Sequence, residues 1–179
     1  LKGSIGQIGR FMRIDEGALD KYISYLSKVK PLAIQSRVLS VKKDFDASHI
    51  ASLTEFPGMS PDIFKTLVEH NGVKAFIFRA FGAGDISMHL MPGIKYLKEK
   101  EIPIVVTSQA PSGVASFQVN ENGKYLKDND LAIPAFDMSI EAMTAKMAWL
   151  LAQKCSYSEI KTRMVQDLHG EITIENELI

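Results

Sequence analysis

From about residue 37 onward, apolar runs of strand length alternate with amphipathic segments of helix length. The runs at residues 73–78 and 102–107 are almost continuously apolar, which is typical of strands covered on both faces. Residues 60–71 and 93–101 place apolar side chains at helical spacing. This order predicts an α/β fold, a small doubly wound domain with a mainly parallel sheet flanked by helices, plus an N-terminal tail or linker.

Local signals mark where two of the helices begin. Ser60 is expected to cap the first helix, with Pro61 at its first helical position. Ser156 and Glu159 have the spacing of a capping box and predict a last helix that Gly170 closes.

Three further segments complete the expected layout. Residues 37–41 predict a short strand, and residues 110–129 predict a turn region with a hairpin-like Asn-Glu-Asn-Gly at 120–123. Residues 140–154 predict a long helix with one apolar face. The methionines in and just before this helix are interpreted as core-filling side chains: Met138, Met143 and Met147.

The first 36 residues differ from the rest. Glycine recurs every third position over residues 3–9, and no Lys-Ser or Lys-Thr follows in the manner of a phosphate loop. We interpret residues 1–36 as an edge hairpin or tail followed by a linker. The chain starts at Leu1 rather than methionine, which is typical of a trimmed product or of a fragment of a longer protein.

Composition narrows the function classes. The 179 residues are 46% hydrophobic and 23% charged, and 21 basic residues balance 21 acidic ones. This balance disfavours nucleic acid or an anionic membrane as the main partner. No apolar run reaches the length of a membrane span. The single cysteine, Cys155, cannot form an internal disulfide, which favours a reducing, cytoplasmic location.

Two residues near the end of the first buried run carry candidate chemistry. In open α/β sheets, ligands bind at the carboxyl ends of the strands. Arg79 is expected to bind a carboxylate there through its guanidinium group. Asp85, which follows a Gly-Ala-Gly turn, is expected to accept a hydrogen bond from an ammonium group. Together they would clamp an amino acid. The structural alternative is that Arg79 extends along the strand end to solvent and Asp85 caps the next segment.

No complete catalytic constellation accompanies them. Thr107 and Ser108 begin a hydroxyl-rich turn, but a nucleophilic hydroxyl needs a base beside it. Glu141 is interpreted as a carboxylate favoured by the positive end of its helix. The sequence contains no His-Glu-x-x-His or Cys-x-x-Cys pattern of the kind that binds metal ions. The histidines are interpreted as surface or cap residues: His49, His70, His89 and His169.

Several of these segments together resemble the C-terminal half of the asparaginase/glutaminase family. The matching motifs run in order over roughly residues 56–173 and include a Gly-x-Gly turn, a Ser-Gln-x-x-Ser-Gly turn and an Asp-Met-Ser-x-Glu-Ala helix start. They are similar to the cytosolic (type I) L-asparaginases and to the asparaginase-like subunit of the archaeal glutamyl-tRNA amidotransferase. They lie at residues 72–85, 102–109, 111–113, 137–142, 146–151 and 170–173.

The resemblance implies hydrolysis of asparagine to aspartate and ammonia through an acyl-enzyme on a threonine, without metal or cofactor. In the family those threonines belong to an N-terminal domain, so no catalytic residue is expected in this chain. Residues 1–36 then correspond to the end of that domain and its linker, and residues 37–179 to the C-terminal α/β domain. The family also implies a homo-oligomer.

For individual residues, the resemblance implies two supporting roles. Asp85 takes the place of a family asparagine that helps to hold the substrate amino group. Arg79 matches an arginine of a regulatory asparagine site, although Ala110 stands where that site has a cysteine.

Three functions remain open from the sequence. The leading one is the C-terminal domain of an L-asparaginase, which joins an N-terminal catalytic domain. The others are a subunit of a tRNA-dependent amidotransferase and a non-catalytic amino-acid-binding or assembly module.

Overall fold

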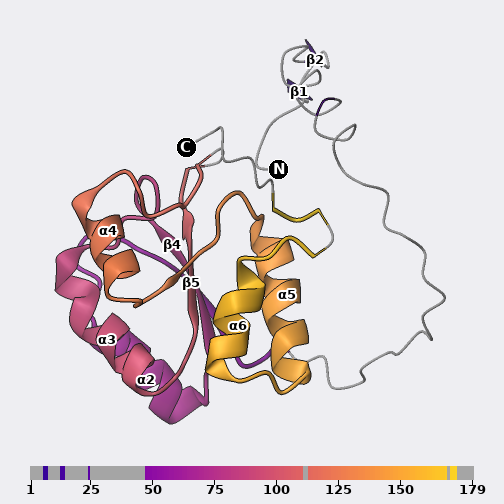
Figure 1. Cartoon of the computed structure of the whole chain (residues 1–179). Coiled ribbons are helices and arrows are strands. Elements are labelled where there is room, and N and C mark those ends of the chain that lie inside the picture. The colour runs from indigo at the N-terminus through magenta and orange to yellow at the C-terminus, as the bar shows by residue number, and fades with distance from the viewer. Residues whose placement is uncertain are drawn as a thin grey trace.

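Four parallel strands form the central sheet of the protein (Figure 1). The computed structural model describes residues 6–7, 13–14, 24, 47–110, 113–168 and 170–172. Within them the strands lie side by side in chain order: β3 (Ile50–Thr54), β4 (Ala75–Ala80), β5 (Ile104–Ser108) and β6 (Ile133–Pro134).

The central strands β4 and β5 divide their side chains between two cores. Ile77 pairs with Ser52 of β3 and Val105 of β5. Because successive side chains of a strand alternate between faces, Phe76 and Phe78 enter one buried cluster, whereas Ile77 enters the other. This two-sided burial accounts for the continuous apolar runs in the sequence.

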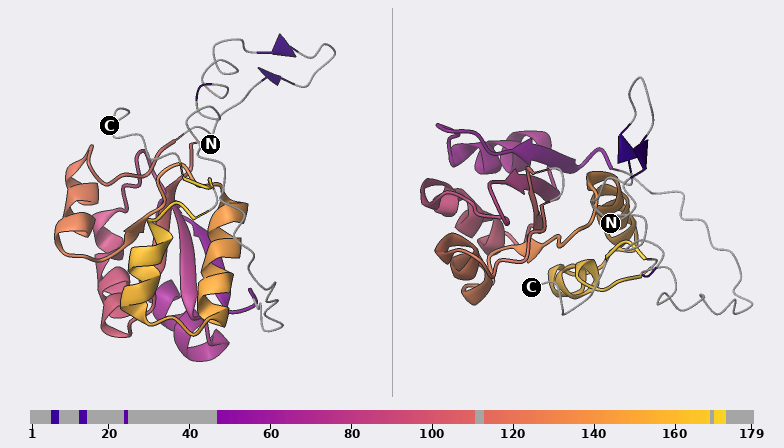
Figure 2. Two further views of the ribbon diagram at one scale, coloured as in Figure 1. Left: turned by 45° about the vertical axis from the view of Figure 1, so that its right-hand side comes forward. Right: turned by 90° about the horizontal axis from the view of Figure 1, so that it is seen from above.

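Helices cover both faces of the sheet (Figure 2). Those connecting consecutive strands lie on one face, as expected when every crossover has the same hand: α2 (Asp62–Asn71), the 3₁₀ turn η1 (Met88–Leu90), α3 (Met91–Glu99) and α4 (Glu121–Asp128). The other face is covered by α5 (Ile140–Ala152) and α6 (Tyr157–Met164). The prediction of a parallel sheet flanked by helices is confirmed.

The helix signals predicted from the sequence are confirmed in part. Helix α2 begins at Asp62, one residue later than predicted, so Pro61 rather than Ser60 is its N-cap, although the Asp62 amide donates to the Ser60 hydroxyl at 3.3 Å. The helix ends at Asn71, and its C-cap, Gly72, has the left-handed conformation. The capping box between Ser156 and Glu159 is present at the start of α6, but the helix ends at Met164 with Val165 at its C-cap, so the prediction that Gly170 closes it is wrong. The three methionines expected to fill the core are fully buried.

One predicted element is wrong and others lie outside the described residues. Residues 120–123 were expected to form a hairpin-like turn, but Glu121 begins helix α4, with Asn120 at its N-cap. Buried Leu126 and Gly123 anchor this helix, and packing overrides the local turn preference of Asn-Gly. The strand expected at residues 37–41 lies outside the described residues. From the N-terminal region, β1 (Gly6–Gln7) pairs antiparallel with β2 (Arg13–Ile14).

The strand β6 lies at one end of the sheet and pairs through two residues. The Ala135 amide donates to the Val106 carbonyl at 2.9 Å, so the backbone of Pro134 points away from β5. A proline is tolerated there because its missing N–H falls on the side of β6 that pairs with no other strand of the described residues. Within the described part of the chain, no helix combines the length and apolarity that a membrane span requires.

Candidate functional site

A tight turn follows β4 at the carboxyl edge of the sheet and carries Asp85. The amides of Gly84 and Asp85 both donate to the carbonyl of Phe81, at 3.0 and 2.8 Å. Gly82 and Gly84 have φ angles of 49° and 97°, in the left-handed region that only glycine adopts without strain. The glycines of the motif therefore fold the chain back so that Asp85 lies beside the strand end.

The partly buried carboxylate of Asp85 is held by a residue distant in sequence. Asn120, the exposed N-cap of α4, donates from Nδ2 to Oδ2 of Asp85. The sequence motifs did not indicate Asn120, because its Asn-Glu-Asn-Gly context is typical of a turn. The predicted substrate residue is thus a carboxylate with one oxygen bound, whereas its other oxygen, Oδ1, accepts no hydrogen bond from the described residues.

Phe117 packs against the same turn, at Gly84. A Cβ added to Gly84 would lie 3.2 Å from the Phe117 ring and 3.1 Å from Cβ of Ala115. Phe117 is 1% exposed. The loop after β5 therefore packs directly against the turn after β4, and the absence of a side chain at position 84 permits this close approach.

Arg79 lies toward the opposite face of the sheet from Asp85. It occupies the β4 position two residues after Ile77, so its side chain points to the side covered by α5 and α6. Its Nε is buried and has no hydrogen-bond partner among the described residues. The two residues expected to clamp one amino acid therefore have separate surroundings.

The sequence motifs did not indicate a buried carboxylate that lies at the end of β3, the strand next to β4. Glu55, 2% exposed, follows β3 and accepts from the Ser87 amide through Oε1 at 3.0 Å. Its Oε2 is buried without a hydrogen-bond partner in the described part of the chain. Gln109 Nε2 donates to the carbonyls of Glu55 and Arg79, at 2.7 and 3.2 Å. These bonds tie together the ends of β3, β4 and β5.

The hydroxyl-rich turn after β5 has a structural role where it is described. Ser108 accepts from the Ala110 amide through Oγ at 3.0 Å, and a Cβ added to Gly113 would meet that oxygen at 2.1 Å.

His89 Nε2 lies 3.0 Å from the Met59 carbonyl, which can only accept, so this nitrogen carries a proton. Residues 111, 112 and 169 lie outside the described residues.

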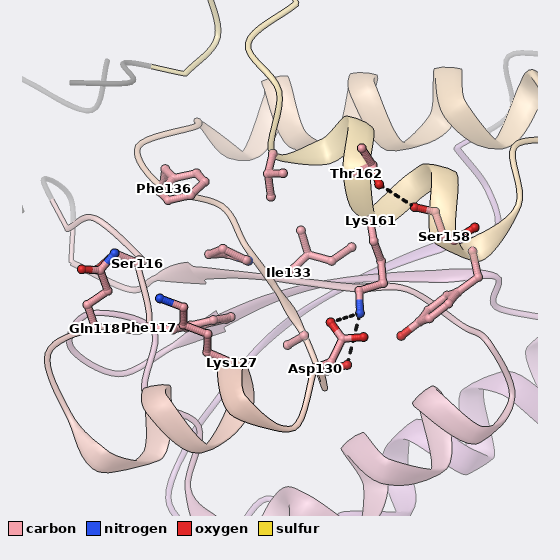
Figure 3. A pocket seen from close by; sticks show the side chains of 14 residues that line it. Ser116, Phe117, Gln118, Lys127, Asp130, Ile133, Phe136, Ser158, Lys161 and Thr162 are labelled. Carbon is pink, nitrogen blue, oxygen red and sulfur yellow. Dashed lines mark hydrogen bonds and ion pairs between the residues drawn. The ribbon is translucent and has the colours of Figure 1, made fainter. Parts of the chain in front are cut away.

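A groove of about 570 Å³ runs beside β6, between the end of α4 and helix α6 (Figure 3). Lys161 of α6 crosses it to form an ion pair with Asp130, and it also donates to the Asp130 carbonyl at 3.2 Å. Burial, together with the nearby Asp130 and Glu101 carboxylates, raises the pKa of Tyr157 in its wall. Asp85 does not line this groove.

Large apolar side chains are exposed around the predicted site rather than in the groove. In the described part of the chain there are five, and they lie in loops or in the short 3₁₀ turn that follow the carboxyl ends of β3, β4 and β5. They are Phe56, Phe81, Met88, Val114 and Val119, with exposures from 38 to 66%. These five side chains therefore share the edge of the sheet that carries Asp85.

Comparison with known proteins gives a consistent family. A family model of the glutaminase/asparaginase C-terminal domain matches residues 49–164. A subunit of the glutamyl-tRNA(Gln) amidotransferase of Aeropyrum pernix is 28% identical over 135 residues, which are 75% of this chain and 31% of that protein. The corresponding protein of Sulfolobus acidocaldarius is 29% identical over 154 residues, which are 86% of this chain and 33% of that protein.

Solved structures show the same fold. The crystal structure of L-asparaginase I from Vibrio cholerae matches 95% of this chain with a TM-score of 0.69 and 28% identity. The thermostable L-asparaginase from Thermococcus kodakarensis matches 96% with a TM-score of 0.70 and 23% identity. This chain covers 48% of each of these structures and about a third of the curated relatives.

Proposed function

Because the chain belongs to the glutaminase/asparaginase C-terminal domain family, we propose that it is the C-terminal domain of an L-asparaginase-type amidohydrolase. The reaction is L-asparagine plus water to L-aspartate plus ammonia, and its threonine nucleophiles belong to an N-terminal domain outside residues 37–179. The C-terminal domain, residues 37–179, contributes a substrate-binding residue and contacts between subunits. The protein works in the cytoplasm.

The observation that carries the proposal is the Asp85 carboxylate at the open carboxyl edge of the sheet. Its Oδ2 is bound by Asn120, which leaves Oδ1 to accept from the α-ammonium of an amino acid. A carboxylate that binds an ammonium group forms a charge-assisted hydrogen bond and orients the substrate, while bond breaking takes place at the side-chain amide.

The exposed apolar residues around Asp85 support a role within an assembly. A second copy of the protein would cover Phe81, Met88 and their neighbours, and would exclude water from the site that Asp85 helps to form. We therefore expect a homo-oligomer in which Asp85 serves the catalytic domain of another copy.

Arg79 has a separate proposed role, as a contact for a regulatory amino acid. Its buried Nε, which has no hydrogen-bond partner among the residues that the structure describes, is a donor that a ligand carboxylate would satisfy. Ala110 follows Gln109 in the adjoining turn and offers no thiol. The proposed contact therefore rests on Arg79 alone.

A second candidate function is favoured by the curated relatives. The two curated relatives described above are subunits of glutamyl-tRNA(Gln) amidotransferases. In this interpretation the released ammonia is used within a complex. The asparaginase interpretation rests instead on the turn at 81–85 and on the solved structures. A non-catalytic amino-acid-binding module is the third interpretation.

Ammonia release by the whole protein that contains this chain separates these candidates. An L-asparaginase releases ammonia from asparagine with no other component. An amidotransferase component needs its partner protein and glutamyl-tRNA, and a binding module binds asparagine without ammonia release. Either of the last two results would overturn the leading proposal.

A further inference from the structure

Asn120 is the residue that fixes the orientation of the Asp85 carboxylate. The two lie 35 positions apart, on the turn after β4 and at the start of α4, and their side chains meet through Asn120 Nδ2 and Asp85 Oδ2. A role for Asn120 in the site rests on the proposed substrate-binding role of Asp85.

The backbone around the pair encloses the carboxylate from two sides. A Cβ added to Gly82 would lie 3.0 Å from Asp85 Oδ2 and 4.0 Å from Asn120 Nδ2. A Cβ added to Gly123 would lie 3.4 Å from Asp85 Oδ1. A side chain at position 82 would therefore crowd Oδ2, whereas one at position 123 would lie at ordinary contact distance from Oδ1. The Asp85 amide is fixed by the Phe81 carbonyl at 2.8 Å.

The chemistry of the two groups determines which atoms face each other. An ionised carboxylate only accepts, so the amide nitrogen of Asn120 must point to it. An amide binds one carboxylate oxygen without neutralising its charge, whereas a lysine or arginine at position 120 would form an ion pair. The pair therefore keeps a full negative charge for a cationic group.

We propose that Asn120 is a positioning and selectivity residue for the substrate ammonium. It holds Oδ2 of Asp85 and leaves Oδ1, which lies beside Gly123 of α4, as the oxygen that would accept from the ammonium. Asn120 is exposed and Asp85 partly buried, so an amino acid held at the interface has access to both.

The alternative is that Asn120 only caps α4 and ties two loops together. If that role is purely structural, substitution of Asn120 should lower stability, and it should reduce activity by a similar factor whether residue 85 is aspartate or alanine. A positioning role predicts a change in KM that depends on Asp85, because uniform substrate binding affects KM and leaves kcat unchanged.

The test measures ammonia release from asparagine by the whole protein in a double-mutant cycle. Asn120→Ala is expected to raise KM about 3- to 10-fold at nearly constant kcat. In the Asp85→Ala background the same substitution should change KM less than about 2-fold. Asn129→Ala is the matched control, because Asn129 is an exposed amide at the other end of α4 that donates to the Tyr125 carbonyl at 2.9 Å.

A near-isosteric pair of variants keeps the test informative if Asn120→Ala unfolds. Asn120→Asp places two carboxylates together and should raise KM more than the alanine variant. Adding Asp85→Asn restores one amide and one carboxylate and should recover part of the loss. An unchanged KM in Asn120→Ala, or equal effects in both backgrounds, overturns the inference alone. A wild-type protein without ammonia release, with or without glutamyl-tRNA, overturns the proposed function and the inference with it.

Discussion

The ammonium of Lys146 on α5 and the carboxylate of Glu171 lie 2.6 Å apart. Lys146 is 7% exposed and also donates to the carbonyl of Gln166. Glu171 in turn accepts from the Leu168 amide, at 3.1 and 3.2 Å through its two oxygens. The chain after α6 is thus pinned to α5, and Ile172, 1% exposed, joins the core beneath the sheet.

Removal of Glu171 should destabilise the protein strongly, because a buried ammonium loses its counter-charge. We expect Glu171→Ala to lower the free energy of unfolding by about 3 kcal/mol, and Lys146→Met combined with Glu171→Leu to lower it less. Urea unfolding measures both. Glu121→Ala, at an exposed position of α4, is the control, and a Glu171 variant as stable as this control would contradict the prediction.

Replacement of Asp85 should weaken substrate binding. We expect Asp85→Ala in the whole protein to lower kcat/KM for asparagine about 10-fold or more, because a charge-assisted hydrogen bond to the substrate is lost. Steady-state ammonia release measures this. Asp128→Ala removes an exposed carboxylate of α4 and should leave the kinetics unchanged. Unchanged kinetics in Asp85→Ala would exclude the substrate-binding role.

Arg79 should affect regulation rather than turnover. If a second asparagine binds near Arg79, the rate depends sigmoidally on asparagine concentration. Arg79→Ala should then make the curve hyperbolic, while turnover at saturation stays nearly unchanged. Initial rates over a wide asparagine range measure this, and a curve whose shape is unaffected by the substitution would remove the effector role.

The capping box of α6 should make stability depend on pH. The Ser156 amide and then its hydroxyl hold the pKa of Glu159 below its ordinary 4.5. A carboxyl whose pKa is lower in the folded state stabilises the fold above its unfolded pKa, and this contribution is lost as the pH falls through the folded pKa.

The stability difference between wild type and Glu159→Gln should therefore be largest near neutral pH and shrink below pH 4.5. Thermal unfolding at a series of pH values measures it. Asp128→Asn, at an exposed position of α4, controls for removal of one negative charge. A difference between wild type and Glu159→Gln that grows toward acid pH would contradict the assignment.

The elements that the sequence predicted well are those with strong burial or strong end signals. β4 and β5 are buried on both faces, and α6 begins at a complete capping box. β3 was missed because an edge strand of small and polar residues, Ile-Ala-Ser-Leu-Thr, lacks a continuous apolar run. β6 was missed because it is two residues long and contains Pro134.

The candidate site was predictable only in part. A glycine turn after a buried strand indicated Asp85, because ligands of parallel sheets collect at that edge. Nothing in local sequence indicated Asn120, which lies at the end of an irregular loop and meets Asp85, 35 positions away, only in the folded chain. Glu55 was likewise missed, since its burial comes from the η1 segment folding over the end of β3.

Pro134 has a consequence for how copies of this protein can associate. An incoming strand needs alternating donors and acceptors along the edge that it joins, and at position 134 it would meet a carbonyl but no N–H. Fibril-like stacking and a continuous sheet through two copies are therefore hindered at this border. In any association of two copies, Pro134 therefore disfavours backbone pairing at β6 relative to contacts between side chains.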